Sequence, residues 1–478
     1  MENLFLPSYH FPPIGVFMRR FDVLIVGSGP GGQRAAFQAA KLKKTVAVIE
    51  RQPYIGGAGL HTGTLPSKTL REAALFLAGF KQRAIFGFQC SIGREVTLQE
   101  LMYRKMDVMK KQMEVIIDQF NRNNIEIIYG EASFRDEHRL SIKSLGGLEE
   151  VYGEVIIIAA GTRPLRPKEV PFDEEHIYDT DSILKINQIP STLTVIGGGV
   201  IGCEYACIFA SLGVKVTLIE KKPRLLPFAD NEIVNSLCYW MTQSGITLRL
   251  NEEVVKITVE SNDRVMTNLK SGKQVVSEKL LYTMGRVGNT DMLNLNAIGI
   301  KPDGRGSLSV NENFQTTIPH IYAIGDVIGF PALASTSMEQ GRRAVCNALH
   351  KEDITCEVVS HLPFGIYTIP EISMVGETEE GLTAKAIAYE VGCALFQEVA
   401  KGQIIGDTHG MLKLLFNRED KRLLGVHIIG ERATELIHIG QAVMSFRGTV
   451  DYFKDTVFNY PTLSDAYKVA ALNGLNRL

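Results

Sequence analysis

Two glycine-rich segments of the chain have the residue types and spacing needed to bind a dinucleotide. The first reads FDVLIVGSGPGGQRAAFQAAKLKKTVAVIE (21–50) and the second reads TLTVIGGGVIGCEYACIFASLGVKVTLIE (192–220). Both have the order strand, G-x-G-x-x-G turn, helix, strand and Glu, and in both the Glu lies 23 residues after the first Gly. Such a turn lets a pyrophosphate reach the backbone and the free N–H groups of the helix N-terminus, and the acid can bind the adenosine ribose. The repeat therefore predicts two nucleotide sites, between which electrons would pass.

The residues of the two motifs have matching roles. The first Gly permits the tight turn, the second lets the pyrophosphate approach, and the third lets the helix pack closely on the strand. In that order, and followed by the acid, they are Gly27, Gly29, Gly32 and Glu50 in the first unit and Gly197, Gly199, Gly202 and Glu220 in the second. We also expect Pro30 and Arg51 at the first site and Ile201 at the second.

The elements that would position these motifs can be read from the surrounding sequence. The segments IIIAAGTRP (156–164) and TTIPHIYAIGDV (316–327) each read as a strand that ends in a glycine turn, and PALAST (331–336) opens an apparent helix. A separate apolar stripe recurs every three to four residues and predicts one packing face of a long helix. Its members are Leu98, Leu101, Met102, Met109, Met113, Ile116 and Phe120.

Composition limits the classes of partner. The 478 residues are 45% hydrophobic and 22% charged, enough for two or three domains, and a net charge of −2 gives no reason to expect nucleic acid or an acidic membrane. A membrane-spanning helix needs about 18 consecutive apolar residues, and no apolar run in the sequence approaches that length. The seven cysteines follow no metal-binding or disulfide-framework spacing, so we expect reduced thiols, no metal and a cytoplasmic protein. The residues before Met18 read as a loose extension, not as a signal peptide.

From about Phe21 to Leu478, the order of these motifs resembles the pyridine nucleotide-disulfide oxidoreductases, such as lipoamide dehydrogenase and glutathione reductase. The resemblance implies an α/β fold with two Rossmann-like dinucleotide-binding domains, one for FAD and one for NAD(P), and a C-terminal α+β dimerisation domain. The implied bounds are 18–182 and 280–352 for the FAD-binding domain, 183–279 for the NAD(P)-binding domain and 353–478 for the dimerisation domain. The working unit would be a homodimer or a larger homo-oligomer.

The same resemblance assigns residues around the flavin. Lys68 resembles the family lysine beside flavin N5 and Glu204 resembles its ion-pair partner, although a lysine on a helix is more often simply solvated. Asp326 would bind the ribityl chain, and the helix that opens near Ala334 would face the flavin. Further cofactor contacts are expected at Gly63, Ala132, Gly161 and Gly285.

The chain departs from the family where a disulfide reductase does its thiol chemistry. In GGAGLHTGTLPSK (56–68), Gly59 and Thr64 occupy the places of the two redox cysteines, and near the C-terminus Tyr460 and Asp465 replace a catalytic His and Glu. Neither Gly nor Thr can supply a thiolate. We expect Thr64 and Tyr460 to remain in the site without thiol exchange, with Tyr460 lying over Thr64 of the partner subunit.

These departures predict a hydride transfer between nicotinamide nucleotides. The runs IYDTDSIL (177–184), GTLPSK (63–68) and FNYPTLSDAYKVAALNGLNRL (458–478) are most similar to the soluble, FAD-containing transhydrogenases of the family. With no dithiol to take the electrons, hydride from NADPH would leave the flavin for NAD in a ping-pong reaction. The alternatives are a flavin-dependent diaphorase or oxidase, a lipoamide dehydrogenase-like protein that lacks the disulfide, and a flavin-bound regulatory protein without catalysis.

The sequence leaves the nucleotide preference open. Glu220 favours the free 2′-hydroxyl of NAD, because a 2′-phosphate there would meet a carboxylate. Lys221, Lys222 and Arg224 follow it directly and could hold the phosphate of NADP, or could equally form a solvated charged loop.

Three other candidates have a plainer interpretation. Cys203 and Cys207 lie four residues apart on one face of the second unit's helix, where reduced core cysteines are commoner than a redox pair. His438 is read as a helix histidine. His61 lies in the active-site turn and is kept as a weaker candidate for chemistry.

Overall fold

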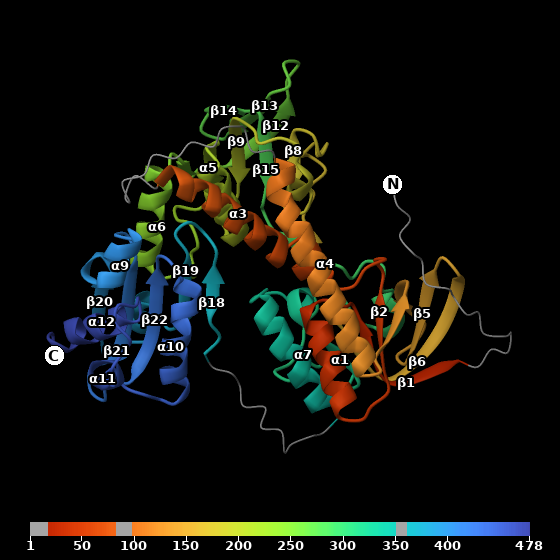
Figure 1. Cartoon of the computed structure of the whole chain (residues 1–478). Helices are drawn as coiled ribbons and strands as arrows, with labels where there is room; N and C mark the ends of the chain where they lie inside the picture. The colour runs from red at the N-terminus through yellow and green to blue at the C-terminus, as the bar shows by residue number, and fades with distance from the viewer. Residues whose placement is uncertain (1–17, 83–97, 350–360) are drawn as a thin grey trace.

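The computed structural model describes residues 18–82, 98–349 and 361–478, which form three domains of mixed helix and strand (Figure 1). The predicted fold class is confirmed, with two doubly wound dinucleotide-binding domains and a C-terminal antiparallel domain. In the part of the chain that is described, no helix is both long and apolar enough to cross a membrane.

The first domain is built on a sheet with the strand order β3-β2-β1-β6 and with β17 paired to the end of β6, all in parallel. The beginning of β6 pairs instead with an antiparallel hairpin of β5 and β4. The strands are β1 (Arg19–Val26), β2 (Val46–Glu50), β3 (Glu126–Tyr129), β4 (Glu131–Phe134), β5 (Arg139–Ser144), β6 (Gly147–Ile158) and β17 (Ile321–Ala323). Strand β2 is buried along its whole length, as expected for a parallel strand covered on both faces.

Two helices pack closely against each other on this sheet. They are α1 (Pro30–Lys41), which follows the first glycine turn, and α7 (Ala334–Ala348), which begins at the residue expected from PALAST (Figure 1). A side chain at Gly341 would place its Cβ 2.2 Å from the carbonyl oxygen of Gly31, so the two backbones can approach only because glycine lies at the crossing.

Long helices join this domain to the next. They are α3 (Thr64–Gln82), which packs against α5 of the second domain, and α4 (Leu98–Arg122), with the short α2 (Gly57–His61) before them (Figure 1). Along α4, Leu101, Ile116 and Phe120 are buried, and Met109 and Met113 pack against the same core as Phe120. From Leu101 to Phe120 the apolar stripe of the sequence is therefore a packing face, as predicted, while the side chain of Leu98 lies outside the described part of the chain.

The second domain has a fully parallel sheet with the order β11-β10-β9-β15-β8. Its parallel strands are β8 (Ile177–Asp179), β9 (Thr192–Ile196), β10 (Lys215–Glu220), β11 (Thr247–Leu250) and β15 (Lys279–Tyr282), with helices α5 (Val200–Ser211) and α6 (Asn231–Gln243). A small antiparallel sheet of β12 (Val254–Val259), β13 (Val265–Leu269) and β14 (Gln274–Ser277) is inserted before β15. Strands β8 and β15 extend this sheet past both limits of the expected range 183–279.

The two domains are linked by a short antiparallel pair, β7 (Thr162–Pro164) with β16 (Arg286–Gly288). The pair lies where the chain leaves the first domain and where it returns. Gly161 and Gly285, one residue before each strand, have φ angles of +64° and +111°, a backbone conformation that glycine adopts without strain.

The third domain is an antiparallel sheet with the order β18-β19-β22-β21-β20 and with helices around it. Its strands are β18 (Phe364–Ile366), β19 (Ile372–Gly376), β20 (Tyr389–Leu395), β21 (Met411–Asn417) and β22 (Leu423–Ile429), and its helices are α8 (Glu379–Ala384), α9 (Ala400–Ile405), α10 (Ala433–Ser445), α11 (Asp451–Asp455) and α12 (Asp465–Leu475). This is the α+β arrangement expected for the C-terminal part.

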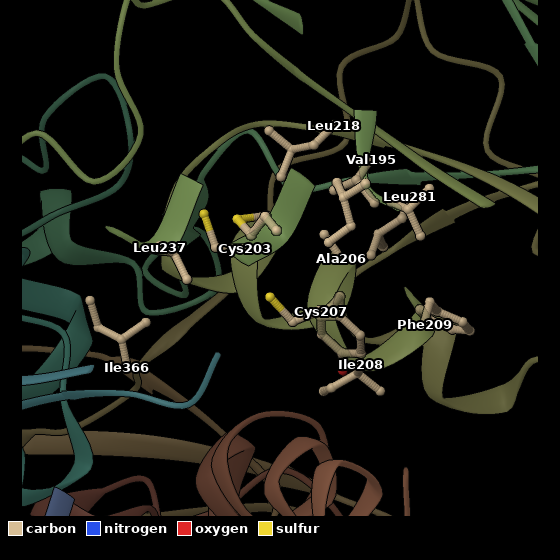
Figure 2. Packing of buried hydrophobic residues seen from close by; sticks show 14 of the residues in the cluster. Val195, Cys203, Ala206, Cys207, Ile208, Phe209, Leu218, Leu237, Leu281 and Ile366 are labelled. Carbon is tan, nitrogen blue, oxygen red and sulfur yellow. The ribbon is translucent and has the colours of Figure 1, made fainter. Parts of the chain in front are cut away.

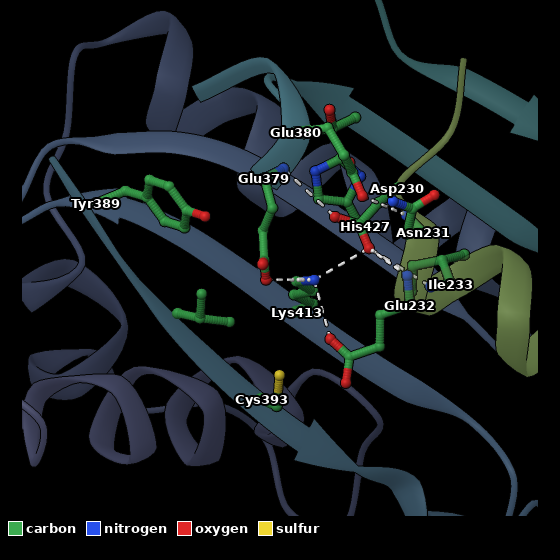
Figure 3. A network of polar contacts seen from close by, with 12 residues as sticks. Asp230, Asn231, Glu232, Ile233, Glu379, Glu380, Tyr389, Cys393, Lys413 and His427 are labelled. Carbon is green, nitrogen blue, oxygen red and sulfur yellow. Dashed lines mark hydrogen bonds and ion pairs between the residues drawn. The ribbon is translucent and has the colours of Figure 1, made fainter. Parts of the chain in front are cut away.

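A buried charge network joins the second and third domains (Figure 3). The Nζ atom of Lys413, on β21, lies 3.0 Å from Asp230, 2.9 Å from Glu232 and 2.6 Å from Glu379. Burial alone would lower the pKa of Lys413, but the three carboxylates raise it, so the lysine is charged at neutral pH. Because Asp230 also caps the N-terminus of α6, accepting from the backbone N–H of Glu232 and Ile233, the network fixes that helix to the third domain.

Candidate active site

The two glycine turns have nearly identical local geometry. A Cβ at Gly32 would lie 2.0 Å from the carbonyl oxygen of Gly27, and one at Gly202 would lie 1.9 Å from that of Gly197, so no side chain fits at either place. A Cβ at Gly29 or Gly199 would meet no atom within 4 Å. Open space thus lies in front of the first turn of α1 and of α5, and neither helix has a side-chain N-cap that competes for its N–H groups.

The acid at the end of the second strand is held in the same way in both units. One carboxylate oxygen of Glu50 accepts from the N–H (3.1 Å) and Oγ (2.6 Å) of Ser28, and the other accepts from the N–H of Gln52 (2.9 Å). Glu220 accepts from the N–H of Gly198 (2.5 Å) and from the N–H of Lys222 (2.8 Å). Each carboxylate is therefore fixed beside its glycine turn, where a ribose attached to a bound pyrophosphate would lie.

The open turn and the fixed acid of the first unit fit a dinucleotide such as FAD, and further expected residues surround them. The carboxylate of Asp326 accepts from the Oγ1 of Thr162 at 3.3 Å, and that hydroxyl in turn accepts from the Nε of Arg286 at 2.8 Å. Burial raises the pKa of Asp326, against the opposing charge of Arg286. Ala334 begins α7 without a side-chain N-cap, so the helix presents free N–H groups there.

The remaining residues expected around the first site lie on its turns and strands. Pro30 is the first residue of α1, Gly63 donates its N–H to the carbonyl of Ala58 at 2.6 Å, Ala132 is buried in β4, and Arg51 is exposed after β2. In the second unit Ile201 lies in the first turn of α5. Their roles as nucleotide contacts stay predictions.

The lysine and glutamate that were expected to pair lie in contact across 136 residues of sequence. The Nζ atom of Lys68, on α3, is 2.6 Å from the Oε2 of Glu204, on α5, and the side chains are 24% and 4% exposed. The other oxygen of Glu204 accepts from the backbone N–H of Tyr367 at 2.9 Å, and the Tyr367 ring lies 4.8 Å from Lys68 Nζ. All three domains therefore meet at this ion pair, and a solvated helix lysine is excluded as the interpretation of Lys68.

The positions that lack the redox cysteines lie against the first site. Gly59 is in α2, where a Cβ would lie 3.1 Å from the Cγ of Pro30 at the start of α1, and Thr64 begins α3 with its side chain exposed. Tyr460 is 76% exposed on the single chain, and Asp465 begins α12. The expectation that Tyr460 lies over Thr64 of the partner subunit stays a prediction.

The other cysteine and histidine candidates have structural surroundings. Cys203 and Cys207 lie in the apolar core of the second domain (Figure 2), where burial raises the pKa of Cys207 to about 12 and that of Cys203 well above its ordinary value. Both are free thiols, as expected for packing residues. The Nε2 atom of His61 contacts the carbonyl of Ile55 at 2.7 Å, and His438 contacts Gln441 at 2.8 Å. Among the described residues no cluster of His, Cys, Asp and Glu could hold a metal ion.

The side chains of the three basic residues after Glu220 have different surroundings. Lys221 forms an ion pair of 2.6 Å with Glu253, Arg224 donates to the carbonyl of Ala229, and the side chain of Lys222 is exposed. Together with Gly197 and Glu220, Lys221 lines a cavity of about 270 Å³ beside the second glycine turn. The solvated-loop interpretation therefore fits Lys222 better than its two neighbours.

Two dinucleotide turns in separate domains, with an ion pair between those domains, are the arrangement expected of an oxidoreductase that binds two nucleotides. Comparison with family models gives the family: the model for pyridine nucleotide-disulphide oxidoreductases matches residues 21–341, and that for the family's dimerisation domain matches residues 362–471. The chain belongs to the pyridine nucleotide-disulphide oxidoreductase family. It is thus an FAD-dependent oxidoreductase with nicotinamide nucleotides as substrates, and its dimerisation domain supports the expected homodimer.

Relatives and solved structures agree with this family over nearly the full length. The chain is 49% identical over 463 residues to a soluble pyridine nucleotide transhydrogenase of Mycobacterium tuberculosis and 47% identical over 464 residues to one of Photobacterium profundum, covering 96% of this chain and 98% of each relative. It is similar in structure to LpdA from Mycobacterium tuberculosis, with a TM-score of 0.88, 26% identity, and coverage of 95% of this chain and 99% of that one. The HOCl-induced flavoprotein disulfide reductase RclA from Escherichia coli has a TM-score of 0.82 at 26% identity, covering 94% and 99%.

Three residues that contact the predicted site were not predicted from the sequence. Thr162 and Arg286 hydrogen-bond to each other beside Asp326, and Tyr367 contacts both Lys68 and Glu204. Thr162 lies in the glycine turn IIIAAGTRP, which is a signal that could have found it. Arg286 and Tyr367 reach the site from distant segments, and no local pattern marks them.

Proposed function

We propose that this protein is an FAD-dependent transhydrogenase that transfers hydride from NADPH to NAD by a ping-pong mechanism without a redox-active disulfide. The observation that carries the proposal is that Gly59 and Thr64 stand in place of the two cysteines while the ion pair between Lys68 and Glu204 is intact. The relatives at 46–49% identity that are named soluble pyridine nucleotide transhydrogenases support it. A disulfide reductase would need a thiolate that this segment does not contain.

FAD, when bound, supplies a group that accepts a hydride and later returns it. The residues that would hold it are the turn around Gly29, Glu50 and Asp326. Lys68 would place a positive charge beside its reactive ring, and Glu204 and the ring of Tyr367 orient that charge. Because neither Gly59 nor Thr64 can take electrons, the protein offers no further acceptor along the path of a disulfide reductase.

The second unit would bind the two nicotinamide nucleotides in turn. The turn around Gly199 leaves room for the pyrophosphate, and Glu220 is fixed beside it for the adenosine ribose. One site that serves both nucleotides requires the first product to leave before the second substrate enters. This requirement is what makes the reaction ping-pong.

We further propose domain limits and a location. The limits 18–182, 183–279, 280–352 and 353–478 remain our division, with β8 and β15 belonging to the sheet of the second domain. Cytoplasmic placement is supported by the free thiols of Cys203, Cys207, Cys238 and Cys393.

The experiment that tests the function is a transfer assay under anaerobic conditions. The purified FAD-loaded dimer is mixed with NADPH and thio-NAD, and the formation of reduced thio-NAD is followed, with lipoamide as a parallel acceptor. We expect turnover with thio-NAD and none with lipoamide. Oxidation of NADPH only when a quinone or oxygen is added would refute the proposal in favour of a diaphorase or oxidase, and turnover with lipoamide would refute the absence of thiol exchange.

A further inference from the structure

Lys221, one of the cations at the second nucleotide site, already forms an ion pair with a neighbouring carboxylate. Lys221 lines the cavity beside Gly197 and Glu220, and its Nζ atom is 2.6 Å from the Oε1 of Glu253. The other oxygen of Glu253 accepts from Lys270 at 3.2 Å. Glu253 is the residue before β12 and lines the same cavity.

The carboxylates around the cavity disfavour binding of a nucleotide with a 2′-phosphate unless a cation neutralises that phosphate. Glu220, Glu252 and Glu253 all line the cavity, and a phosphate dianion placed among them would be repelled. Lys222 and Arg224 do not line it, and Arg224 is turned to the carbonyl of Ala229. Two lysines line the cavity, Lys221 and Lys256. Lys221 directly follows Glu220 in the chain, whereas Lys256 lies on β12, so Lys221 is the cation beside the acid that would bind the ribose.

The ion pair is weak enough to be exchanged. The side chains of Lys221 and Glu253 are 60% and 34% exposed, and pairs exposed to this extent contribute little to stability because water and salt screen them. A phosphate dianion offers more charge to a lysine than a single carboxylate does. Lys221 can thus change partner at small cost, while Glu253 keeps its contact with Lys270.

We propose that Lys221 is a cation shared between Glu253 and the 2′-phosphate of the bound nucleotide, and that Glu253 sets the preference of this site between NAD and NADP. With NAD bound, Lys221 stays paired with Glu253 and the uncharged 2′-hydroxyl meets Glu220. With NADP bound, Lys221 turns to the phosphate. One site can then accept both nucleotides, which deepens the proposed function and rests on nucleotide binding at the second turn.

The test is the affinity of the FAD-loaded dimer for NADP⁺ and for NAD⁺, measured by titration calorimetry, because the two ligands differ only in the 2′-phosphate. Glu253→Gln should tighten NADP⁺ binding by about 10-fold, since it frees Lys221 and removes one negative charge, and should change NAD⁺ binding by less than about 2-fold. Lys221→Gln should weaken NADP⁺ binding by about 10-fold and leave NAD⁺ binding unchanged.

A matched control separates release of the lysine from simple loss of charge. Glu252 lines the same cavity but pairs with Lys273 at 2.7 Å, so Glu252→Gln removes the same charge and leaves Lys221 paired. We expect it to tighten NADP⁺ by no more than about 3-fold. The double variant Lys221→Gln with Glu253→Gln is compared with Lys221→Gln alone. In this pair, the gain in NADP⁺ affinity caused by Glu253→Gln should be no larger than the gain caused by Glu252→Gln in the wild type.

The outcomes distinguish this inference from the proposed function. If both nucleotides bind the wild-type dimer but Glu253→Gln and Glu252→Gln shift the affinity ratio equally, or if the double variant keeps the full gain, the sharing of Lys221 is refuted. If the ratio moves as expected while the transfer assay with thio-NAD fails, the specificity inference stands and the transhydrogenase proposal falls.

Discussion

Replacing Lys68 by methionine is expected to slow reduction of the bound flavin by NADPH by at least about 100-fold, with the flavin still bound. Methionine has nearly the length of lysine and no charge. Lys68 is only partly exposed and is oriented by Glu204 and Tyr367, so its charge acts where water screens it weakly. The measurement is anaerobic stopped-flow absorbance of the flavin after mixing with NADPH.

A second variant rules out an indirect effect of the first. Removing Lys68 alone leaves the carboxylate of Glu204 buried with only the N–H of Tyr367 beside it, which could disturb the site. The double variant Lys68→Met with Glu204→Gln has no unpaired charge. We expect it to stay slow; recovery to the wild-type rate would show that the unpaired glutamate, and not the missing lysine, caused the loss.

Valine at Gly199 is expected to lower the rate of NADPH oxidation by at least about 100-fold while leaving the bound flavin in place. Gly199 has φ −78° and ψ −175°, an extended conformation that valine adopts readily, and a Cβ there meets no atom within 4 Å. The chain should therefore fold around the new side chain, which then fills the space that a pyrophosphate needs. Flavin content and steady-state oxidation of NADPH measure the effect.

The repeated turn of the first unit provides the matched control. Gly29 has φ −65° and ψ 178° and the same open space, so valine there should yield a folded dimer purified without flavin. In the Gly199→Val protein, dithionite should still reduce the flavin, because only nucleotide access has changed. Oxidation of NADPH at the wild-type rate by Gly199→Val would contradict nucleotide binding at the second turn. Loss of flavin from this variant would contradict it as well.

The sequence predicted those parts of the structure that are encoded within a short segment. Each glycine turn with its helix and acid lies within about thirty residues. In both turns the acid, Glu50 or Glu220, accepts from the backbone N–H of the residue after the first Gly. The long helix α4 was predictable because its apolar residues repeat with helical period. The pairing of Lys68 with Glu204 spans 136 residues and was reached only through the resemblance to a family.

What could not be predicted depends on residues that meet in space without a local pattern. Tyr367 and Lys413 come from the third domain and contact the other domains through single side chains or one backbone N–H. Strand β8 has three residues and β15 has four, too few for a period, so the limits of the second sheet fell outside the expected range. The different partners of Lys221 and Arg224 follow from the fold of the loop, since the sequence shows only their charge.

We expect the flavin to be the only electron store on the catalytic path, and the number of electrons taken up per FAD tests this expectation. An anaerobic titration of the FAD-loaded dimer with dithionite, followed by flavin absorbance and thiol counting, should end after two electrons per FAD with no change in thiol number. Uptake of four electrons per FAD with the appearance of new thiols would reveal a second, disulfide store and contradict the account.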